Sequence, residues 1–191
     1  VDANGHLVTQ LEPEFSSRPA TAAILSKLKS LAVQSDVDMG WQLVDPETMR
    51  PRTIELLEYP GEHSASLGWH QDTQSALTVL LMMSDREDYE GGNLQHEHHD
   101  REYAAPLEKR GDVAVYRSHQ YHRVTDTTKG LRVSMAIEFW HVATGDPLHS
   151  KFWDDSDAAA LPGRKKKKKK KNDGRPMFKD AAAPFHDVCP R

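Results

Sequence analysis

Residues 75–83 read SALTVLLMM, a mostly apolar run with the length of a single buried strand. Similar runs lie on either side of it, and turn signals such as Pro60-Gly61 and Gly91-Gly92 separate them. These further runs are TIELLEY at 53–59, GDVAVY at 111–116 and RVSMAIEFW at 132–140. Several short strands at close intervals favour a sandwich, jelly roll or barrel. The lack of regular strand–helix alternation argues against a parallel doubly wound sheet.

Upstream of these strands, residues 17–33 have the pattern of one amphipathic helix. Apolar side chains recur there at helical spacings, at Ala20, Ala23, Ile24, Leu28 and Leu31. We expect Ser16 or Ser17 to cap the start of this helix, and a short strand to follow at residues 42–44. The sequence therefore predicts a mainly β domain with a flanking N-terminal helix or helices.

Composition limits the class of protein. The chain has 191 residues, which suits one domain with a sizeable core. A single cysteine, Cys189, excludes an intramolecular disulfide framework and a cysteine-rich zinc module. The sequence contains no apolar run long enough to span a bilayer, so we expect no membrane partner.

Charge divides the chain in two. Residues 1–150 carry 13 Lys or Arg and 23 Asp or Glu, whereas residues 151–191 carry 12 and 6. We place a domain at 1–150 and a basic low-complexity tail, expected to be disordered, at 151–191. The tail contains seven lysines, Lys165 to Lys171, which could attract nucleic acid or serve as a nuclear localisation signal, or could have no specific partner.

The chemically informative residues begin at His70 and Asp72. On an extended segment, residues two apart project to the same side. The imidazole of His70 and the carboxylate of Asp72 would therefore be presented together, as two possible metal ligands. A second imidazole, His122, follows fifty residues downstream. Two histidines and one carboxylate on one face leave open positions on a divalent metal, as in non-haem Fe(II) oxygenases. The alternative interpretation of His70 and Asp72 alone is a polar surface turn.

Arg132 is the second informative position, because it stands in a strand otherwise rich in apolar residues. We expect a turn at residues 127–130 to join two strands, with Arg132 and Ser134 on one face of the second strand and Val133, Met135 and Ile137 on the other. A guanidinium there needs an anionic partner, and its planar fork suits a carboxylate. The alternative partner is a carboxylate of the protein itself.

Together, His70-x-Asp72, His122 and Arg132-x-Ser134 resemble the Fe(II)- and 2-oxoglutarate-dependent dioxygenases. The surrounding motifs are similar to the prolyl 4-hydroxylase-type catalytic domain, over about residues 52–142. These motifs are Tyr59-Pro60-Gly61, DYEGGNL at 88–94, Gly111-Asp112, and HRVT at 122–125 followed by GLR at 130–132.

The resemblance implies a double-stranded β-helix, also called a jelly roll and similar to the cupins. It implies that His70, Asp72 and His122 hold Fe(II), and that Arg132 and Ser134 bind the distal carboxylate of 2-oxoglutarate. The implied reaction uses O2 to hydroxylate an amino-acid side chain, first of all a prolyl residue in a peptide or protein, and releases succinate and CO2. Ascorbate is a further cofactor that the resemblance suggests.

Two further residues are weighed for the cosubstrate pocket. Tyr59 sits where the family often places a phenol near 2-oxoglutarate, and its alternative role is that of a core tyrosine. Thr78 offers a hydroxyl on a strand where some prolyl hydroxylases have a second tyrosine. By contrast, we interpret the cluster His96-Glu97-His98-His99-Asp100 as a solvated loop near the site entrance.

Other functions remain open at this stage. A lysyl or small-molecule hydroxylase of the same superfamily is one alternative, and a non-redox metal-binding jelly roll that uses its basic tail for interactions is another. Nucleic-acid dealkylases of the superfamily usually have a second arginine six residues after the first, and this chain has Glu138 there. The lysine run and the lack of paired cysteines favour the cytoplasm or nucleus. The secretory pathway stays open because the chain begins with Val1.

Overall fold

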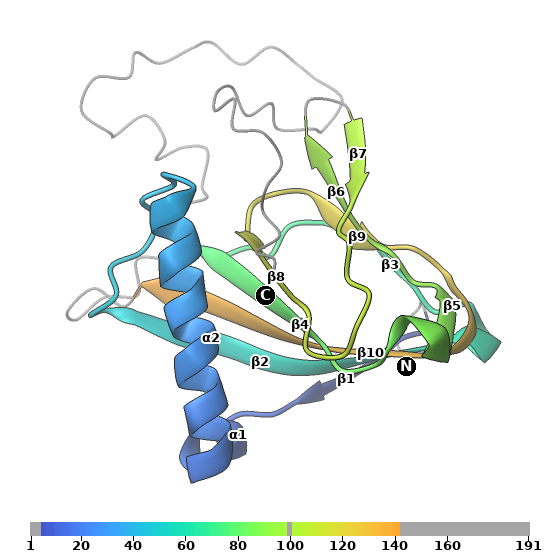
Figure 1. Cartoon of the computed structure of the whole chain (residues 1–191), viewed down its shortest axis with the longest axis horizontal. Coiled ribbons are helices and arrows are strands. Elements are labelled where there is room, and N and C mark those ends of the chain that lie inside the picture. Colours follow the sequence, from blue (N-terminus) through green and yellow to red (C-terminus); the bar gives the residue numbers. More distant parts are fainter. Residues whose placement is uncertain (1–4, 99–100, 142–191) are drawn as a thin grey trace.

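The computed structural model describes residues 5–98 and 101–141, and Figure 1 shows how their elements are arranged. The strands are β1 (Leu7–Gln10), β2 (Met49–Pro60), β3 (Leu67–His70), β4 (Leu77–Met82), β5 (Tyr89–Gly91), β6 (Leu94–His98), β7 (Arg101–Ala104), β8 (Val113–Arg117), β9 (His122–Val124) and β10 (Thr127–His141). The helices are α1 (Glu14–Ser17) and α2 (Pro19–Asp38), and the short 3-10 turns are η1 (Gly61–His63) and η2 (Arg86–Asp88).

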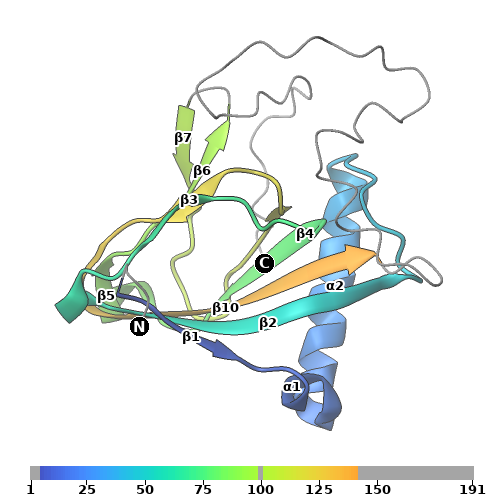
Figure 2. The same cartoon turned by 180° about the vertical axis from the view of Figure 1, so that it is seen from behind.

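Two antiparallel sheets make up the domain. The larger sheet has the order β1-β2-β10-β4-β8, with β5 also paired to β10, and the smaller sheet has the order β3-β9-β6-β7. In Figures 1 and 2, the smaller sheet lies over one face of the larger sheet, and α2 crosses the opposite face. This arrangement of two antiparallel sheets confirms the predicted jelly roll with flanking N-terminal helices.

Strand β10 separates two hydrophobic cores because its side chains alternate between its two faces. Met135, Ile137 and Phe139 pack with α2, whose Leu28 and Ala32 are buried in the same cluster. The other face of β10 looks toward the smaller sheet, where a second core is formed. That core contains Leu57, Tyr59, Leu80, Met82, Leu94 and Tyr116. The predicted division of faces along β10 is therefore confirmed, and the inter-sheet face is the one that carries Arg132 and Ser134.

The N-terminal helix was predicted at residues 17–33, whereas α2 begins at Pro19 and ends at Asp38. Its N-cap is Arg18, which makes no side-chain capping hydrogen bond, and Pro19 begins the helix, while Ser16 and Ser17 belong to α1. Proline suits the first helical position because its fixed φ angle is helical and it needs no hydrogen-bond acceptor there.

Residues 42–44 are not the expected short strand. The buried carboxylate of Asp36, near the end of α2, accepts hydrogen bonds from the backbone N–H groups of Leu43 and Val44. These bonds tie the segment to the helix, so its backbone donors are satisfied without a partner strand.

The predicted turn at residues 127–130 was also wrong, because these residues are the first part of β10. They pair with β5, in a register that shifts between Thr127 and Lys129. Gly130 has a φ angle of +71°, and a Cβ there would lie 2.0 Å from the Asp88 carbonyl oxygen. A glycine therefore allows the strand to continue past η2, and the change of direction falls earlier, between β9 and β10.

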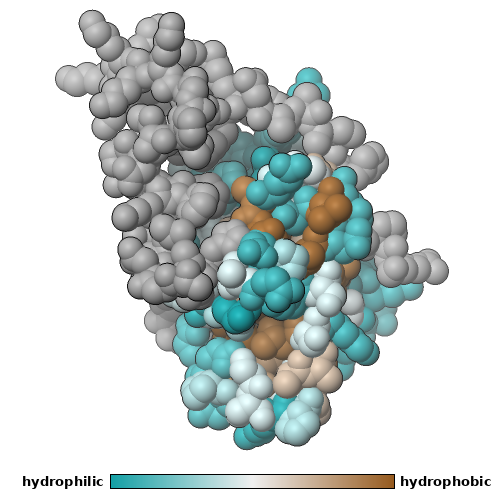
Figure 3. Space-filling view, turned by 90° about the vertical axis from the view of Figure 1, so that its left-hand side faces the viewer, coloured by the Kyte–Doolittle hydropathy of each residue, from teal (hydrophilic) through white to brown (hydrophobic). Residues whose placement is uncertain are grey.

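Figure 3 shows one side of the molecule, on which hydrophobic and hydrophilic residues are interspersed. None of the described helices has the length and hydropathy needed to cross a membrane. The predictions about the basic tail, Cys189 and Lys165 to Lys171 fall outside the described residues.

Candidate metal centre and anion pocket

His70, Asp72 and His122 meet at the mouth between the two sheets. His70 ends β3, and His122 begins the neighbouring strand β9, directly opposite it in the register. The Nε2 atoms of both histidines lie 3.5 Å from the same oxygen, Oδ1 of Asp72. One ligand atom from each residue falls within 4.8 Å of the other two. Two imidazole nitrogens and a carboxylate oxygen this close suit Fe(II), so the residues fit the metal that the family resemblance implies.

Backbone carbonyls orient both rings. Nδ1 of His70 lies 2.7 Å from the Gly68 carbonyl oxygen, and Nδ1 of His122 lies 2.9 Å from that of Gln120. With Nδ1–H as the donor in each case, Nε2 carries the free electron pair that a metal requires. The structure thus directs both Nε2 atoms toward Asp72.

The protonation of these groups follows from burial and mutual charge. Burial alone would raise the pKa of Asp72, but hydrogen bonds from His70 and Thr78 and the nearby charge of His122 outweigh it and lower that pKa. Burial lowers the pKa of His122. In His70, the effect of burial is outweighed by its hydrogen bonds and by the charge of Asp72, which together raise the pKa. A metal must therefore displace a proton chiefly from His70.

Asp72 lies just beyond β3, in a loop that is held on two sides. Its backbone N–H donates to the Ser118 carbonyl oxygen at 2.8 Å. Its second carboxylate oxygen, Oδ2, accepts a hydrogen bond of 2.6 Å from the hydroxyl of Thr78, which is also 2.9 Å from the Ser118 hydroxyl. Thr78, a candidate cosubstrate ligand in the sequence analysis, thus contacts the carboxylate of the candidate metal centre. Its hydroxyl leaves Oδ1 free to face the two histidines.

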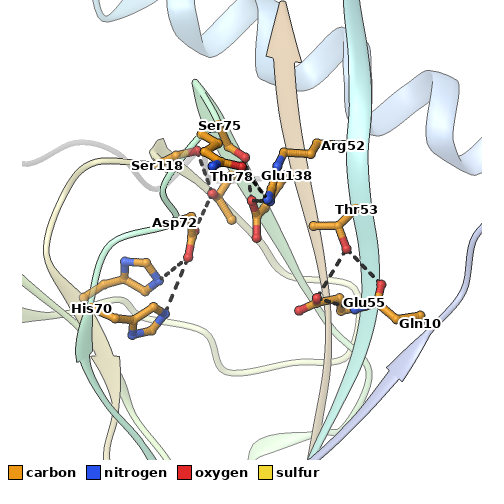
Figure 4. A network of polar contacts seen from close by, with 12 residues as sticks. Gln10, Arg52, Thr53, Glu55, His70, Asp72, Ser75, Thr78, Ser118 and Glu138 are labelled. Atoms are coloured by element: carbon orange, nitrogen blue, oxygen red, sulfur yellow. Dashed lines mark hydrogen bonds and ion pairs between the residues drawn. The ribbon is translucent and has the colours of Figure 1, made fainter. Parts of the chain in front are cut away.

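A second polar group fastens the same loop to the larger sheet. Glu138, on the inter-sheet face of β10, accepts hydrogen bonds from the Ser75 hydroxyl and from Arg52, the latter at 2.9 Å. Arg52 also donates to the side chain of Gln74. Figure 4 shows this group on the far side of Thr78 from Asp72. Burial and the charge of Asp72 raise the pKa of Glu138 to about 7.

Arg132 lies on the face of β10 that is turned toward the smaller sheet. Its side chain is almost fully buried, with 1% exposed. Nη1 donates to the Ser134 hydroxyl at 2.9 Å, Nη2 lies 3.6 Å from the Met82 sulfur, and the guanidinium lies over the Tyr59 ring at 5.0 Å. Its Nε makes no hydrogen bond in the described part of the chain, and no described carboxylate lies within ion-pair distance. A buried guanidinium with neutral neighbours fits the carboxylate of a bound ligand.

Gly92 makes room for this arginine. A Cβ at Gly92 would lie 2.8 Å from Cδ of Arg132 and 2.8 Å from the Thr127 hydroxyl, and the residue has a φ angle of +59°. Glycine thereby lets the chain before β6 pass close to the guanidinium. Gly91-Gly92 can be recognised in the sequence as a turn signal and as part of a motif, but the contact with Arg132 cannot.

His96 corrects the expectation of a solvated loop at residues 96–100. Residues 94–98 form β6, and His96 is buried, with 3% exposed. Burial lowers the pKa of His96, and the charge of His122 lowers it further, to about 3. The imidazole of His96 is therefore neutral near pH 7. Tyr116 contacts its ring edge-on, with centroids 4.7 Å apart. Residues 99–100 lie outside the described part of the chain.

The fold and the site define a class: a jelly roll with a two-histidine, one-carboxylate metal centre and a buried arginine nearby. The 2OG-Fe(II) oxygenase superfamily matches residues 54–141, a span from β2 to β10 that contains His70, Asp72, His122 and Arg132. This region is therefore similar to the 2OG-Fe(II) oxygenases, the family that the sequence motifs resemble.

Individual relatives agree with this assignment. A PKHD-type hydroxylase from Acidovorax ebreus is 38% identical over 73 residues, covering 38% of this chain and 31% of that protein. One from Idiomarina loihiensis is 29% identical over 127 residues, covering 62% and 52%. The chain therefore spans about a third to a half of the length of these relatives. A prolyl hydroxylase from Trichoplax adhaerens, solved with a hypoxia inducible factor peptide, has the same fold (TM-score 0.57, 16% identity, 81% of this chain and 70% of that chain).

Proposed function

We propose that this chain is an Fe(II)- and 2-oxoglutarate-dependent hydroxylase of prolyl residues in a peptide or protein, releasing succinate and CO2. The observation that carries the proposal is the buried guanidinium of Arg132, which lacks an anionic partner among the described residues and shares the inter-sheet space with the metal centre. Burying an unpaired charge costs several kcal/mol, so such a group is expected only where an anionic ligand binds it. A metal-binding jelly roll without redox chemistry would not need that ligand.

Each site residue has a distinct task in this proposal. His70, Asp72 and His122 would hold Fe(II), and Arg132 with Ser134 would hold the distal carboxylate of 2-oxoglutarate. Fe(II) and 2-oxoglutarate, when bound, supply the oxidant for an unactivated C–H bond. The protein's residues orient these groups and exclude water. Tyr59, fully buried beneath the guanidinium, would form the floor of the cosubstrate pocket.

The choice of a prolyl side chain is supported by the relatives. The PKHD-type proteins are named as hydroxylases, and the Trichoplax protein is a prolyl hydroxylase that binds a peptide. A neutral, apolar ring also needs no charged partner in the pocket, which agrees with the pairing of Glu138 to Arg52.

One observation favours a lysyl side chain as a second candidate. Glu138 places a carboxylate on the same face of β10 as Arg132, next to Thr78 in the register. A cationic side chain could pair with that carboxylate. Because Arg52 already neutralises part of its charge, the prolyl substrate remains the first proposal.

The test is turnover with peptides. The protein is incubated in air with Fe(II), ascorbate, 2-oxoglutarate and matched peptides that contain Pro, Lys or Ala at one position. The proposal expects one added oxygen atom on the Pro peptides and an equal amount of succinate, with both lost in Arg132→Leu. Oxygen on the Lys peptides alone would favour the second candidate. No succinate from any peptide, under conditions in which a known prolyl hydroxylase is active, would contradict the proposed function.

A further inference from the structure

A third imidazole stands in line with the two proposed metal ligands. In the smaller sheet, His122 of β9 lies directly opposite His70 on one side and directly opposite His96 on the other. Residues directly opposite in antiparallel strands project to the same face. The ring centroids of His96 and His122 are 5.8 Å apart, and both side chains are buried.

His96 is close to the centre without being one of its ligands. The group whose ligand atoms lie within 4.8 Å of one another, in the described residues, contains His70, Asp72 and His122. Tyr116, from the opposite sheet, contacts both His96 and His122, with ring centroids 4.7 and 4.8 Å away. The imidazole of His96 is thus held beside the centre by packing from both sheets.

Strand β6 connects the two ends of the proposed cosubstrate site. Gly92, just before β6, lies against the side chain of Arg132, and His96 lies opposite His122. The four residue-to-residue steps from Gly92 to His96 span at most roughly 13 Å. The inward-facing positions along this stretch are Leu94 and His96, which are both buried. Leu94 and His96 therefore lie along the stretch of chain that leads from Arg132 to the proposed metal ligand His122.

From this geometry we infer that His96 is a cosubstrate-binding residue, which donates a hydrogen bond from an imidazole N–H to the metal-bound end of 2-oxoglutarate. The inference rests on the proposed function. Leu94 contacts the apolar middle of the cosubstrate, and Arg132 contacts its distal carboxylate. His96 would thereby help to orient the metal-bound end of the cosubstrate.

The test separates metal binding from cosubstrate binding. Co(II) binding alone is followed by its d–d spectrum, and then Fe(II) and 2-oxoglutarate are titrated without oxygen and the visible charge-transfer band of the chelate is recorded. The variants are His96→Leu, which removes the donor, and His96→Gln, which keeps an N–H donor. The control is His63→Leu, the same substitution at an exposed histidine in η1.

The inference expects His96→Leu to bind Co(II) within twofold of the wild type, to bind 2-oxoglutarate roughly tenfold more weakly, and to shift the band. His96→Gln should recover most of the affinity, and His63→Leu should match the wild type. An unchanged band and affinity in folded His96→Leu would overturn the inference, as would a large loss of Co(II) affinity, which would make His96 a ligand. If the wild type itself gives no band, the proposed function fails with it.

Discussion

Replacing Thr78 by Val tests how the protein holds its metal-ligating carboxylate. The Thr78 hydroxyl is buried and donates to Oδ2 of Asp72 at 2.6 Å, while Oδ1 faces His70 and His122. Valine has nearly the same shape, so the substitution removes the donor and leaves the packing. A hydrogen bond to a charged group contributes about 1.5–3 kcal/mol. We therefore expect Co(II) to bind about 10- to 100-fold more weakly, the range typical for residues that orient metal ligands.

The assay is a Co(II) titration of metal-free protein in the absence of 2-oxoglutarate. Thr78→Ser keeps the hydroxyl and should retain nearly full affinity. Ser118→Ala removes the neighbouring hydroxyl, 2.9 Å from that of Thr78, and should have a smaller effect. If Thr78→Val binds Co(II) like the wild type and instead loses affinity for 2-oxoglutarate, Thr78 acts on the cosubstrate and our reasoning about Asp72 is refuted.

Three further predictions concern the surroundings of the site. Gly92→Ala should weaken 2-oxoglutarate binding and also lower the melting temperature, because the added Cβ would displace Arg132. Gly40 also has a positive φ angle, +64°, but a Cβ there would have nothing within 4 Å. Gly40→Ala should therefore lower only the melting temperature. Glu138 has a pKa of about 7 in the folded metal-free protein, against an ordinary value of 4.5. Between these pH values the folded state binds more protons than the unfolded state. The free energy of unfolding should therefore fall by about 3 kcal/mol as pH rises through this range. Glu138→Gln should remove that loss, and thermal melts across the same pH range would contradict this if both proteins changed in parallel. Co(II) affinity should fall as pH is lowered from about 7.5 to about 5.5, because the raised pKa of His70 makes a proton compete with the metal, and a pH-independent isotherm would argue against His70 as a ligand.

Much of the fold could be predicted because buried strands leave a strong pattern. The alternation along RVSMAIEFW, at 132–140, placed Met135 and Ile137 on one face and Arg132 with Ser134 on the other, as the two cores require. The boundaries were harder. The segment 127–130 has a turn-like composition, but its pairing with β5 made it strand, and such long-range pairing leaves no local signal.

The proximity of His70, Asp72 and His122 could be predicted from the sequence, but the groups that surround them could not. His70-x-Asp72 is a local pattern, and His122 and Arg132 gained meaning through a family resemblance. The contact of Thr78 with Asp72 could not be predicted, because the partner of a hydroxyl depends on which loop folds over it. His96 was misread because it lies in a polar sequence, although it and Leu94 occupy alternate positions on one face of β6. Two-residue periodicity would have found it if that stretch had been read as a strand.

The most direct test of the account is the affinity of the wild type and Arg132→Leu for two ligands, measured without oxygen in the presence of Fe(II). The first is 2-oxoglutarate, and the second is 2-oxobutanoate, which keeps the metal-binding end and lacks the distal carboxylate. The account predicts that the arginine substitution weakens 2-oxoglutarate by roughly tenfold or more and leaves 2-oxobutanoate unchanged. Equal losses for both ligands, or none for either, would contradict the claim that the buried guanidinium receives the cosubstrate's distal carboxylate.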